Sequence, residues 1–260
     1  MVRKATKIET YLAQIEEQRT LLSQIDLSDY EIANLRQFNK VKEIYSSNAI
    51  EGNTFTENET AILLETGMPI VGKVLKENLE IVNLSKAIDY SDDLITFDKS
   101  IDFNNLILNM HSIAMAGLLN DPSAVGRFIQ VRNLLGGPST DTNSSQAIWL
   151  YMKELENVYE TKRDSLHPIF LACIISYRFV CIHPFVDGND RVSRLLLNYI
   201  LGKYGYLSVI INPDTKHDYY KALEDSNKEK GYFKCDSYIE YICSVLLKRY
   251  RDEVENLSRD

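Results

Sequence analysis

The sequence is poor in long apolar segments, in cysteine and in basic charge. Its longest wholly apolar run is Ile169–Ile175, far short of the ~20 residues that span a bilayer, and the N-terminus lacks the apolar stretch of a secretion signal. The 37 Asp and Glu exceed the 29 Lys and Arg, giving a formal charge of −8, which disfavours non-specific binding to nucleic acid or anionic membrane. We therefore expect a cytoplasmic protein with no nucleic-acid and no membrane partner.

The four cysteines lie at positions 173, 181, 235 and 243, each in an apolar helical stretch and none in a C-x-x-C pair. This pattern favours buried, reduced thiols over a zinc site or a disulfide framework. Hydrophobic residues make up 45% of the 260 positions, which is close to the globular average and enough to build a sizeable core.

Hydrophobic residues recur at helical spacing along most of the chain, beginning with Leu12, Ile15 and Leu22. Thr56–Glu59 forms a capping box that opens a further helix. We expect one mostly helical domain with an N-terminal helical extension packed on it and a turn region at 92–102. The later helices are expected at 60–66, 75–90, 103–119, 145–163, 168–181, 191–204, 214–228 and 238–254.

Two glycine-containing segments stand apart from the helices. The stretch 126–143 is the best strand candidate, because apolar residues precede a glycine-rich turn, and it predicts a short hairpin or loop. Gly67–Lys73 spells G-x-x-x-x-G-K, but Val74 follows in place of the Ser or Thr that would hold magnesium. The segment also follows a helix and not a strand, which argues against a P-loop.

The segment His183–Arg194 concentrates the residues that carry chemistry. Pro184 prevents simple continuation of the preceding apolar helix, and Gly188 permits the positive φ of a tight loop. The first N–H groups of the next helix point into this loop, which makes an anion site. Arg191 and Arg194 lie three residues apart on one helical face, so their guanidinium groups suit a polyphosphate.

Two further side chains of this segment add catalytic chemistry. Asp187 offers one hard carboxylate, and magnesium commonly uses one or two carboxylates while phosphate and water supply its other ligands. His183 is a titratable base within reach of the same pocket. Each feature alone is commonly structural, but their combination between two apolar helices favours a functional site.

His183–Arg194 resembles the Fic motif, H-P-F-x-D/E-G-N-G-R-x-x-R, at every defined position but one. Ser47–Asn53 resembles the inhibitory motif of the same family, S/T-x-x-x-E-G/N, here N-terminal to the core. The resemblance implies a mainly α fold, a Fic-type helical bundle with one short β-hairpin flap and an N-terminal helical extension. Residues 1–60 would carry the inhibitory motif, and residues 61–260 would form the catalytic core and the C-terminal helices within one compact unit.

The resemblance further implies an autoinhibited, Mg²⁺-dependent protein adenylyltransferase. Such an enzyme moves AMP from ATP to a Ser, Thr or Tyr hydroxyl of a target protein, which can be the enzyme itself, and a homo-oligomer is compatible with this function. His183 would be the general base, Asp187 would hold Mg²⁺, and Phe185 would pin the loop. Glu51, with Ser47, would pair with Arg194 in the place of the γ-phosphate.

The resemblance assigns the other residues of the site by position. The phosphates would contact the loop and the first turn of the following helix, the adenosine would lie against a C-terminal helix, and the flap would hold the target. These groups are Gly188, Asn189, Asp190, Arg191 and Arg194 for the phosphates, Tyr219, Tyr220 and Asn227 for the adenosine side, and Leu135, Gly136 and Gly137 for the flap.

Two positions depart from the family pattern. Ile129 stands where many members carry Arg, and Asp190 replaces the second glycine of the loop. A carboxylate at a helix N-terminus favours capping of the N2 or N3 amide, and it repels a triphosphate. The sequence leaves open weakened adenylyl transfer, altered phosphate chemistry, or loss of catalysis in a nucleotide- or partner-binding protein. The family resemblance also permits removal of AMP from modified proteins.

Overall fold

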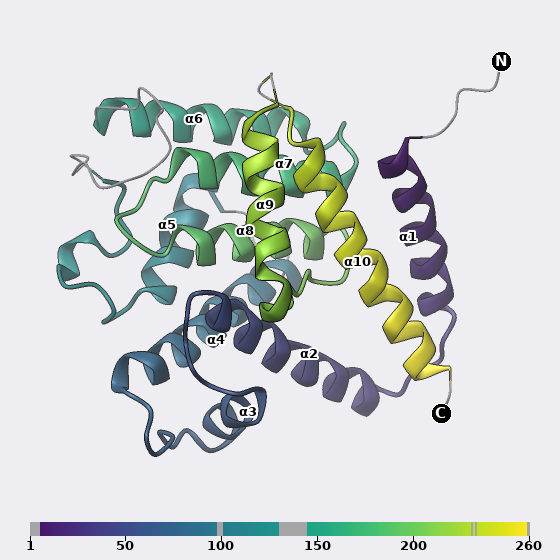
Figure 1. The fold of residues 1–260 in the computed structure, drawn as a ribbon, viewed down its shortest axis with the longest axis horizontal. Helices are drawn as coiled ribbons and strands as arrows, with labels where there is room; N and C mark the ends of the chain where they lie inside the picture. The colour runs from purple at the N-terminus through teal and green to yellow at the C-terminus, as the bar shows by residue number, and fades with distance from the viewer. Residues whose placement is uncertain (1–5, 98–100, 130–144, 230, 232, 259–260) are drawn as a thin grey trace.

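The computed structural model describes residues 6–97, 101–129, 145–229, 231 and 233–258. Within these ranges the chain is helical and contains no strand (Figure 1). The mainly α fold is confirmed, whereas the predicted flap falls largely outside the described residues. The helices are α1 (Lys7–Ser23), α2 (Asp29–Ile50), α3 (Glu57–Thr66), α4 (Leu75–Thr96), α5 (Phe103–Ala114), α6 (Ser145–Lys162), α7 (Pro168–Ile182), α8 (Asn189–Lys203), α9 (Lys216–Asn227) and α10 (Asp236–Leu257), with 3-10 turns η1 (Pro122–Ala124) and η2 (Pro213–Thr215).

Local sequence fixes the ends of the first three helices. Thr6, Ser28 and Thr56 each cap a helix, and a glutamate three residues later completes a capping box in each case. A Ser or Thr at such a position typically contributes ~1 kcal/mol. Gly67 ends α3 with φ +69°, a conformation that glycine adopts without a Cβ penalty.

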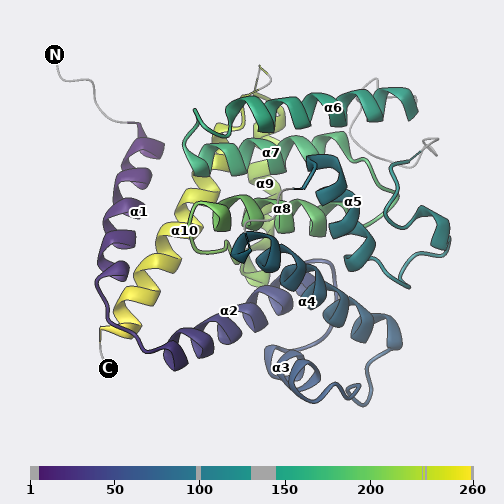
Figure 2. The same cartoon turned by 180° about the vertical axis from the view of Figure 1, so that it is seen from behind.

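Helix α7 lies at the centre of the core. Ile169, Ile175 and Phe179 have no exposed surface, and a helix that is apolar on all sides must be surrounded by other elements. Helix α8 packs along α7, while α6 and α10 cover other sides. Both views place α7 and α8 side by side between α6 and α4 (Figures 1 and 2). The connection between α7 and α8 therefore leaves the core at one end of this central pair.

The N-terminal helices belong to the same core. Helix α1 packs on α10, and α2 packs on α3, α4 and α8. Ile15 of α1 and Ile44 of α2 are fully buried in one cluster with Tyr250 of α10. Helix α2 thus runs across the molecule and brings its last turn next to α8.

The ends of α4 and α5 differ most from those expected. Helix α4 continues to Thr96, so the predicted turn at 92–102 is wrong in its first part, because Ser91 and Leu94 extend the buried face of the helix. Helix α5 ends at Ala114 and not at 119. Gly117 there adopts φ +69°, and Asn83 of α4 donates to the carbonyl of Ala116 at 2.7 Å, which stabilises a turn in place of the helix.

The segment Gly67–Lys73 serves packing between α3 and α4. The Nζ of Lys73 donates to the carbonyl of Thr54 at 2.6 Å and lies 3.2 Å from a carboxylate oxygen of Glu59. The lysine that a P-loop would direct to phosphate is therefore bound to the start of α3. The four cysteines are free thiols. None of the helices in the described part of the chain has the length and apolar character needed to cross a membrane.

Candidate active site

The site is built on the loop between α7 and α8. His183 follows α7 with φ +52° and ψ +58° and donates its N–H to the carbonyl of Phe179 at 3.0 Å. Among the described residues it is the only non-glycine with positive φ, and the following Pro184 does not favour this conformation. A strained backbone held by well-packed neighbours is typical of functional positions. This backbone conformation places the exposed side chain of His183 at the end of the buried helix α7.

Asn189 closes the loop from inside. Its Oδ1 accepts from the N–H of Phe185 at 2.9 Å, and its Nδ2 donates to the carbonyl of the same residue at 2.8 Å. The side chain is 2% exposed, so its amide is buried and bonded to the backbone of the loop. Asn189 therefore holds the loop through its side chain, while its backbone N–H belongs to the first turn of α8. Phe185 itself is fully buried, as expected for a residue that pins the loop.

His111 of α5 packs against the loop and hydrogen-bonds to it. Its ring stacks on Phe185 with centroids 3.7 Å apart. Its Nδ1 accepts from the N–H of Gly126 at 2.9 Å, so its Nε2 donates to the carbonyl of Asp187 at 3.1 Å. Burial lowers the pKa of His111 to about 4, and the neutral ring that this arrangement requires is the stable form. Ile129 adds a further bond, from its N–H to the carbonyl of Pro184 at 2.8 Å.

Gly188, and not Asp190, is the N-cap of α8. Gly188 adopts φ +77°, and no side chain among the described residues makes a capping hydrogen bond at this end of α8. A Cβ at this position would lie 2.5 Å from the Sδ of Met115, so both the backbone angle and the packing require glycine. The capping role expected for Asp190 is wrong, because the helix begins at Asn189, two residues earlier than expected, and places Asp190 at its second position. The first N–H groups of α8 keep the character of an anion site.

Asp187 presents its carboxylate at the open side of the loop. Its Oδ1 accepts from the N–H of Gly188 at 2.7 Å, which orients the group, and the residue is exposed. No group of three or more His, Cys, Asp or Glu that could hold a metal occurs among the described residues. Any metal here would take one protein carboxylate and complete its shell with substrate phosphate and water, which is how magnesium is usually bound.

Arg194 is bound by the last turn of α2. Its Nε donates to the Oγ of Ser47 at 2.9 Å, and its Nη2 donates to the carbonyl of Ser47 at 3.0 Å and to the Oε1 of Glu51 at 2.9 Å. The side chains of Arg194 and Glu51 are 7% and 24% exposed. The Nη1 of Arg194 is buried and has no hydrogen-bond partner among the described residues. The contact expected from the two motifs is thus present.

Arg191, one turn earlier on α8, is bound by α4. Its Nη2 lies 2.9 Å from the Oε1 of Glu80, and both side chains are almost fully buried. Its Nη1 contacts the Sδ of Met115 at 3.6 Å. The structure therefore brings both motif arginines to the same side of α8, and each faces a carboxylate.

Asp190 lies in a crowded electrostatic environment. Burial raises its pKa, and the negative charges of Glu51 and Asp187 act in the same direction. The positive charges of Arg194 and His183 oppose this shift. Because Asp190 and Arg194 are four residues apart, the two share a helical face. The carboxylate that replaces the motif glycine thus competes with Glu51 for the charge of Arg194.

Helix α9 completes this side of the site. Tyr219 is fully buried, and its hydroxyl has no hydrogen-bond partner within the described ranges. Burial raises the pKa of Tyr219. The positive charge of Arg194 opposes this shift, and the negative charge of Asp190 adds to it. Tyr220 is 39% exposed, and burial together with Glu51 raises its pKa to about 12. Asn227 is exposed at the end of α9.

Sequence reasoning missed three side chains that shape the site. Glu80 binds Arg191, His111 binds the loop, and Met115 packs under Gly188. A buried glutamate on an apolar helix face would have been the usable signal for Glu80, because such a carboxylate needs a partner. The expected flap residues Leu135, Gly136 and Gly137 lie outside the described residues.

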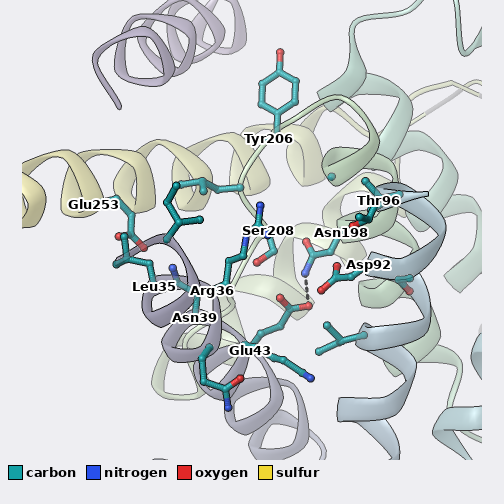
Figure 3. Close-up of a pocket in the computed structure, with 18 of the residues that line it drawn as sticks. Leu35, Arg36, Asn39, Glu43, Asp92, Thr96, Asn198, Tyr206, Ser208 and Glu253 are labelled. Atoms are coloured by element: carbon teal, nitrogen blue, oxygen red, sulfur yellow. Dashed lines mark hydrogen bonds between the residues drawn. The ribbon is translucent and has the colours of Figure 1, made fainter. Parts of the chain in front are cut away.

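A cavity of about 700 Å³ is lined by residues of α2, α4, α8 and α10. Figure 3 shows Glu43 on α2 accepting a hydrogen bond from Asn198 on α8, at 2.8 Å, with Asp92 nearby. None of the residues assigned to the site by sequence lines this cavity. It is separate from the loop between α7 and α8.

Comparisons with known proteins agree with this geometry. Residues 101–201 match the family model described as the Fic/DOC family. The chain is 33% identical over 221 residues to a "Protein adenylyltransferase Fic" of Drosophila grimshawi, a match that covers 85% of this chain and 45% of the relative. A protein of the same name from Nematostella vectensis is 33% identical over 224 residues, covering 83% and 50%. The chain thus spans about half the length of the curated relatives it matches.

Solved structures share the fold over nearly the whole chain. A Fic domain containing signaling protein from Bacteroides thetaiotaomicron has a TM-score of 0.81 at 22% identity and covers 98% of this chain and 99% of its own. Fic-1 from C. elegans has a TM-score of 0.79 at 26% identity, covering 95% and 71%. These likenesses confirm the Fic-type helical fold.

Proposed function

Because the chain belongs to the Fic/DOC family, we propose that it is a protein adenylyltransferase, which transfers AMP from ATP to a Ser, Thr or Tyr hydroxyl of a target protein. The observation that carries the proposal is the strained, exposed His183 beside the uncapped start of α8. A base and an anion site so placed suit attack by a hydroxyl on a phosphate.

In the proposed reaction, His183 takes the proton of the target hydroxyl. The hydroxyl oxygen forms a bond to the α-phosphorus of ATP, and the bond to pyrophosphate breaks. General-base help of this kind is worth ~10²–10⁴ in rate. Backbone N–H groups at the start of α8 stabilise the charge on the phosphates, and Arg191 and Arg194 face the β- and γ-phosphates.

Magnesium fits the donor set of the loop. Asp187 is exposed, and the N–H of Gly188 orients its Oδ1, so the carboxylate is prepared to act as a single protein ligand. The metal would neutralise charge on the phosphates of ATP. On the adenosine side, Tyr220 and Asn227 are the exposed candidates, whereas Tyr219 is fully buried.

We also propose that the protein as described is autoinhibited. The Nε and Nη2 groups of Arg194 cannot bind the γ-phosphate while Ser47 and Glu51 occupy them. A target protein, which can be a second copy of this chain, would be the acceptor. The cytoplasmic location expected from the sequence stays a prediction.

The specific alternative is a nucleotide- or partner-binding protein that has lost catalysis. Asp190 favours it, because its half-buried carboxylate, when charged, repels a triphosphate. Removal of AMP from a modified protein is a second reaction that the same residues permit, with Glu51 as the group that orients water.

One labelling experiment separates these functions. The protein, as wild type and as Glu51→Gly, is incubated with Mg²⁺ and with ATP labelled at either the α- or the γ-phosphate. We expect α-label on protein, lost in His183→Ala and kept in His217→Ala, because His217 is an exposed histidine of α9. Transfer of γ-label would mean kinase chemistry. Binding of ATP without any transfer would mean a binding protein, and release of AMP from a labelled protein would mean the reverse reaction.

A further inference from the structure

The Fic motif holds two arginines, and the structure gives each a carboxylate partner from outside the motif. Arg194 pairs with Glu51, and Arg191 pairs with Glu80 at 2.9 Å. The Arg191–Glu80 pair is the more deeply buried, with side chains 10% and 7% exposed. A buried ion pair contributes little net stability but fixes the geometry of its members. Because this pair lies next to the anion site, it can fix the position of Arg191 there.

The second oxygen of Glu80 leads back to the inhibitory segment. Its Oε2 accepts from the Nδ2 of Asn53 at 2.9 Å, and the same Nδ2 donates to the carbonyl of Glu77 at 3.1 Å. The Oδ1 of Asn53 accepts from the N–H of Phe55 at 3.0 Å. Two acceptors therefore face the amide nitrogen and one donor faces its oxygen, which fixes the orientation of the amide.

Asn53 and Glu51 belong to one tight turn. Gly52, between them, adopts φ +94°, and the N–H groups of Glu51 and Asn53 both donate to the carbonyl of Asn48, at 3.0 and 3.1 Å. Arg191 and Arg194 are one helical turn apart on α8 and face the same side. A single turn of chain thus reaches both arginines, Arg194 directly and Arg191 through Glu80.

The guanidinium of Arg191 is held on more than one side. Its Nη2 binds Glu80, and its Nη1 contacts Met115, which also packs under Gly188. Its Nε is buried and has no partner among the described residues. Glu80 therefore sets the direction of the guanidinium toward the loop.

We propose that Glu80 is a positioning residue for Arg191 and that Asn53 couples it to Glu51, so that the turn Glu51–Asn53 governs both motif arginines. The proposal rests on the adenylyltransferase function above. It assigns the inhibitory segment two effects: Glu51 blocks the γ-phosphate position, and Asn53 holds the arginine that faces the β-phosphate. Movement of the turn then changes both contacts together.

AMP and ADP differ by the β-phosphate and therefore isolate Arg191. Binding of AMP, ADP and ATP with Mg²⁺ is measured by calorimetry on Glu51→Gly and on Glu51→Gly with Glu80→Gln, which keeps the shape of the side chain. We expect affinity for ADP and ATP to fall about tenfold, the size of one charge-assisted hydrogen bond, while affinity for AMP is unchanged. The control is Glu43→Gln, which removes a carboxylate that contacts α8 through Asn198.

The coupling between Asn53 and Glu51 is tested through the rate of AMP transfer. With Glu51 present, Asn53→Ala should raise transfer of AMP, because the turn loses its anchor on α4. In the Glu51→Gly background the same change should not raise transfer further. Equal increases in both backgrounds would contradict the coupling.

The outcomes distinguish this proposal from the proposed function. If the Glu51→Gly protein binds ATP and transfers AMP but Glu80→Gln weakens AMP and ADP equally, or changes neither, the positioning role is overturned and the enzyme function stands. If Glu51→Gly binds no nucleotide at all, both are overturned. Should Glu80→Gln fail to fold, as seen by circular dichroism, the ADP-to-AMP affinity ratio of Asn53→Ala decides the question.

Discussion

Glu51 and Arg194 lie 143 positions apart in the chain, and their side chains meet at 2.9 Å between Oε1 and Nη2. Ser47 binds the same guanidinium through its hydroxyl and its carbonyl. One arginine at the anion site is therefore bound by three acceptors from the last turn of α2. A phosphate that binds the Nη2 of this arginine must displace Glu51, because Glu51 occupies that group.

Replacing Glu51 with glycine should raise the rate of AMP transfer. The change removes one charge-assisted hydrogen bond to Arg194, which corresponds to ~10-fold or more in the population of free arginine. The measurement is initial rate of α-label incorporation at saturating Mg²⁺. Ser47→Ala, which leaves the carboxylate in place, should produce a smaller increase. An unchanged rate for Glu51→Gly would contradict inhibition by this contact.

Binding of ATP should depend on pH through Asp190. Burial and Glu51 raise the pKa of Asp190, so the protonated, uncharged form persists to higher pH than for an ordinary aspartic acid. ATP is an anion and favours that form, so affinity should fall as the pH rises through the pKa of Asp190. Calorimetry over a series of pH values above the ordinary aspartate value of 3.8 would show this slope in the wild type. Asp190→Asn should flatten it, and an identical slope in both proteins would rule out Asp190 as its cause.

His111 should make the fold sensitive to mild acid. Its folded-state pKa is lowered from 6.5 to about 4 by burial, so between these values the unfolded chain binds more protons than the folded one. Stability therefore rises with pH across this window and is lost as the pH falls, by up to ~3 kcal/mol. Urea unfolding of wild type and His111→Gln, from about pH 7 to pH 4.5, measures it. The variant should lack this contribution, whatever its stability at pH 7.

Gly188→Ala should destabilise the protein more than a substitution at an equally strained but open glycine. A Cβ at 188 would meet the Sδ of Met115 at 2.5 Å, whereas at Gly67, with φ +69°, nothing lies within 4 Å. Strain alone costs ~1–2 kcal/mol, and crowding adds ~1–3 kcal/mol. The free energies of unfolding in urea should therefore fall further for Gly188→Ala. Met115→Ala combined with Gly188→Ala should recover part of the difference, and equal losses at both glycines would exclude the packing argument.

Features encoded in contiguous residues were predictable. The capping box of Thr56, the helix end at Gly67 and the break at Pro184 were expected at positions close to those observed. Each depends on hydrogen bonds or backbone angles within a few residues, so local sequence contains the required information. The cap of α8 was predicted at the wrong residue, Asp190 in place of Gly188, because the start of α8 depended on how Gly188 packs on Met115.

The sequence by itself determined the helices, the loop and the residue types that a phosphate site needs, because these follow from periodicity and from short-range chemistry. Only the tertiary structure decided which groups meet in that site. Glu80 reaches Arg191 across 111 positions, and His111 reaches Asp187 across 76. A buried carboxylate or imidazole needs a polar partner wherever the fold supplies one, and the packing of α4, α5 and α8 alone fixes which partner that is.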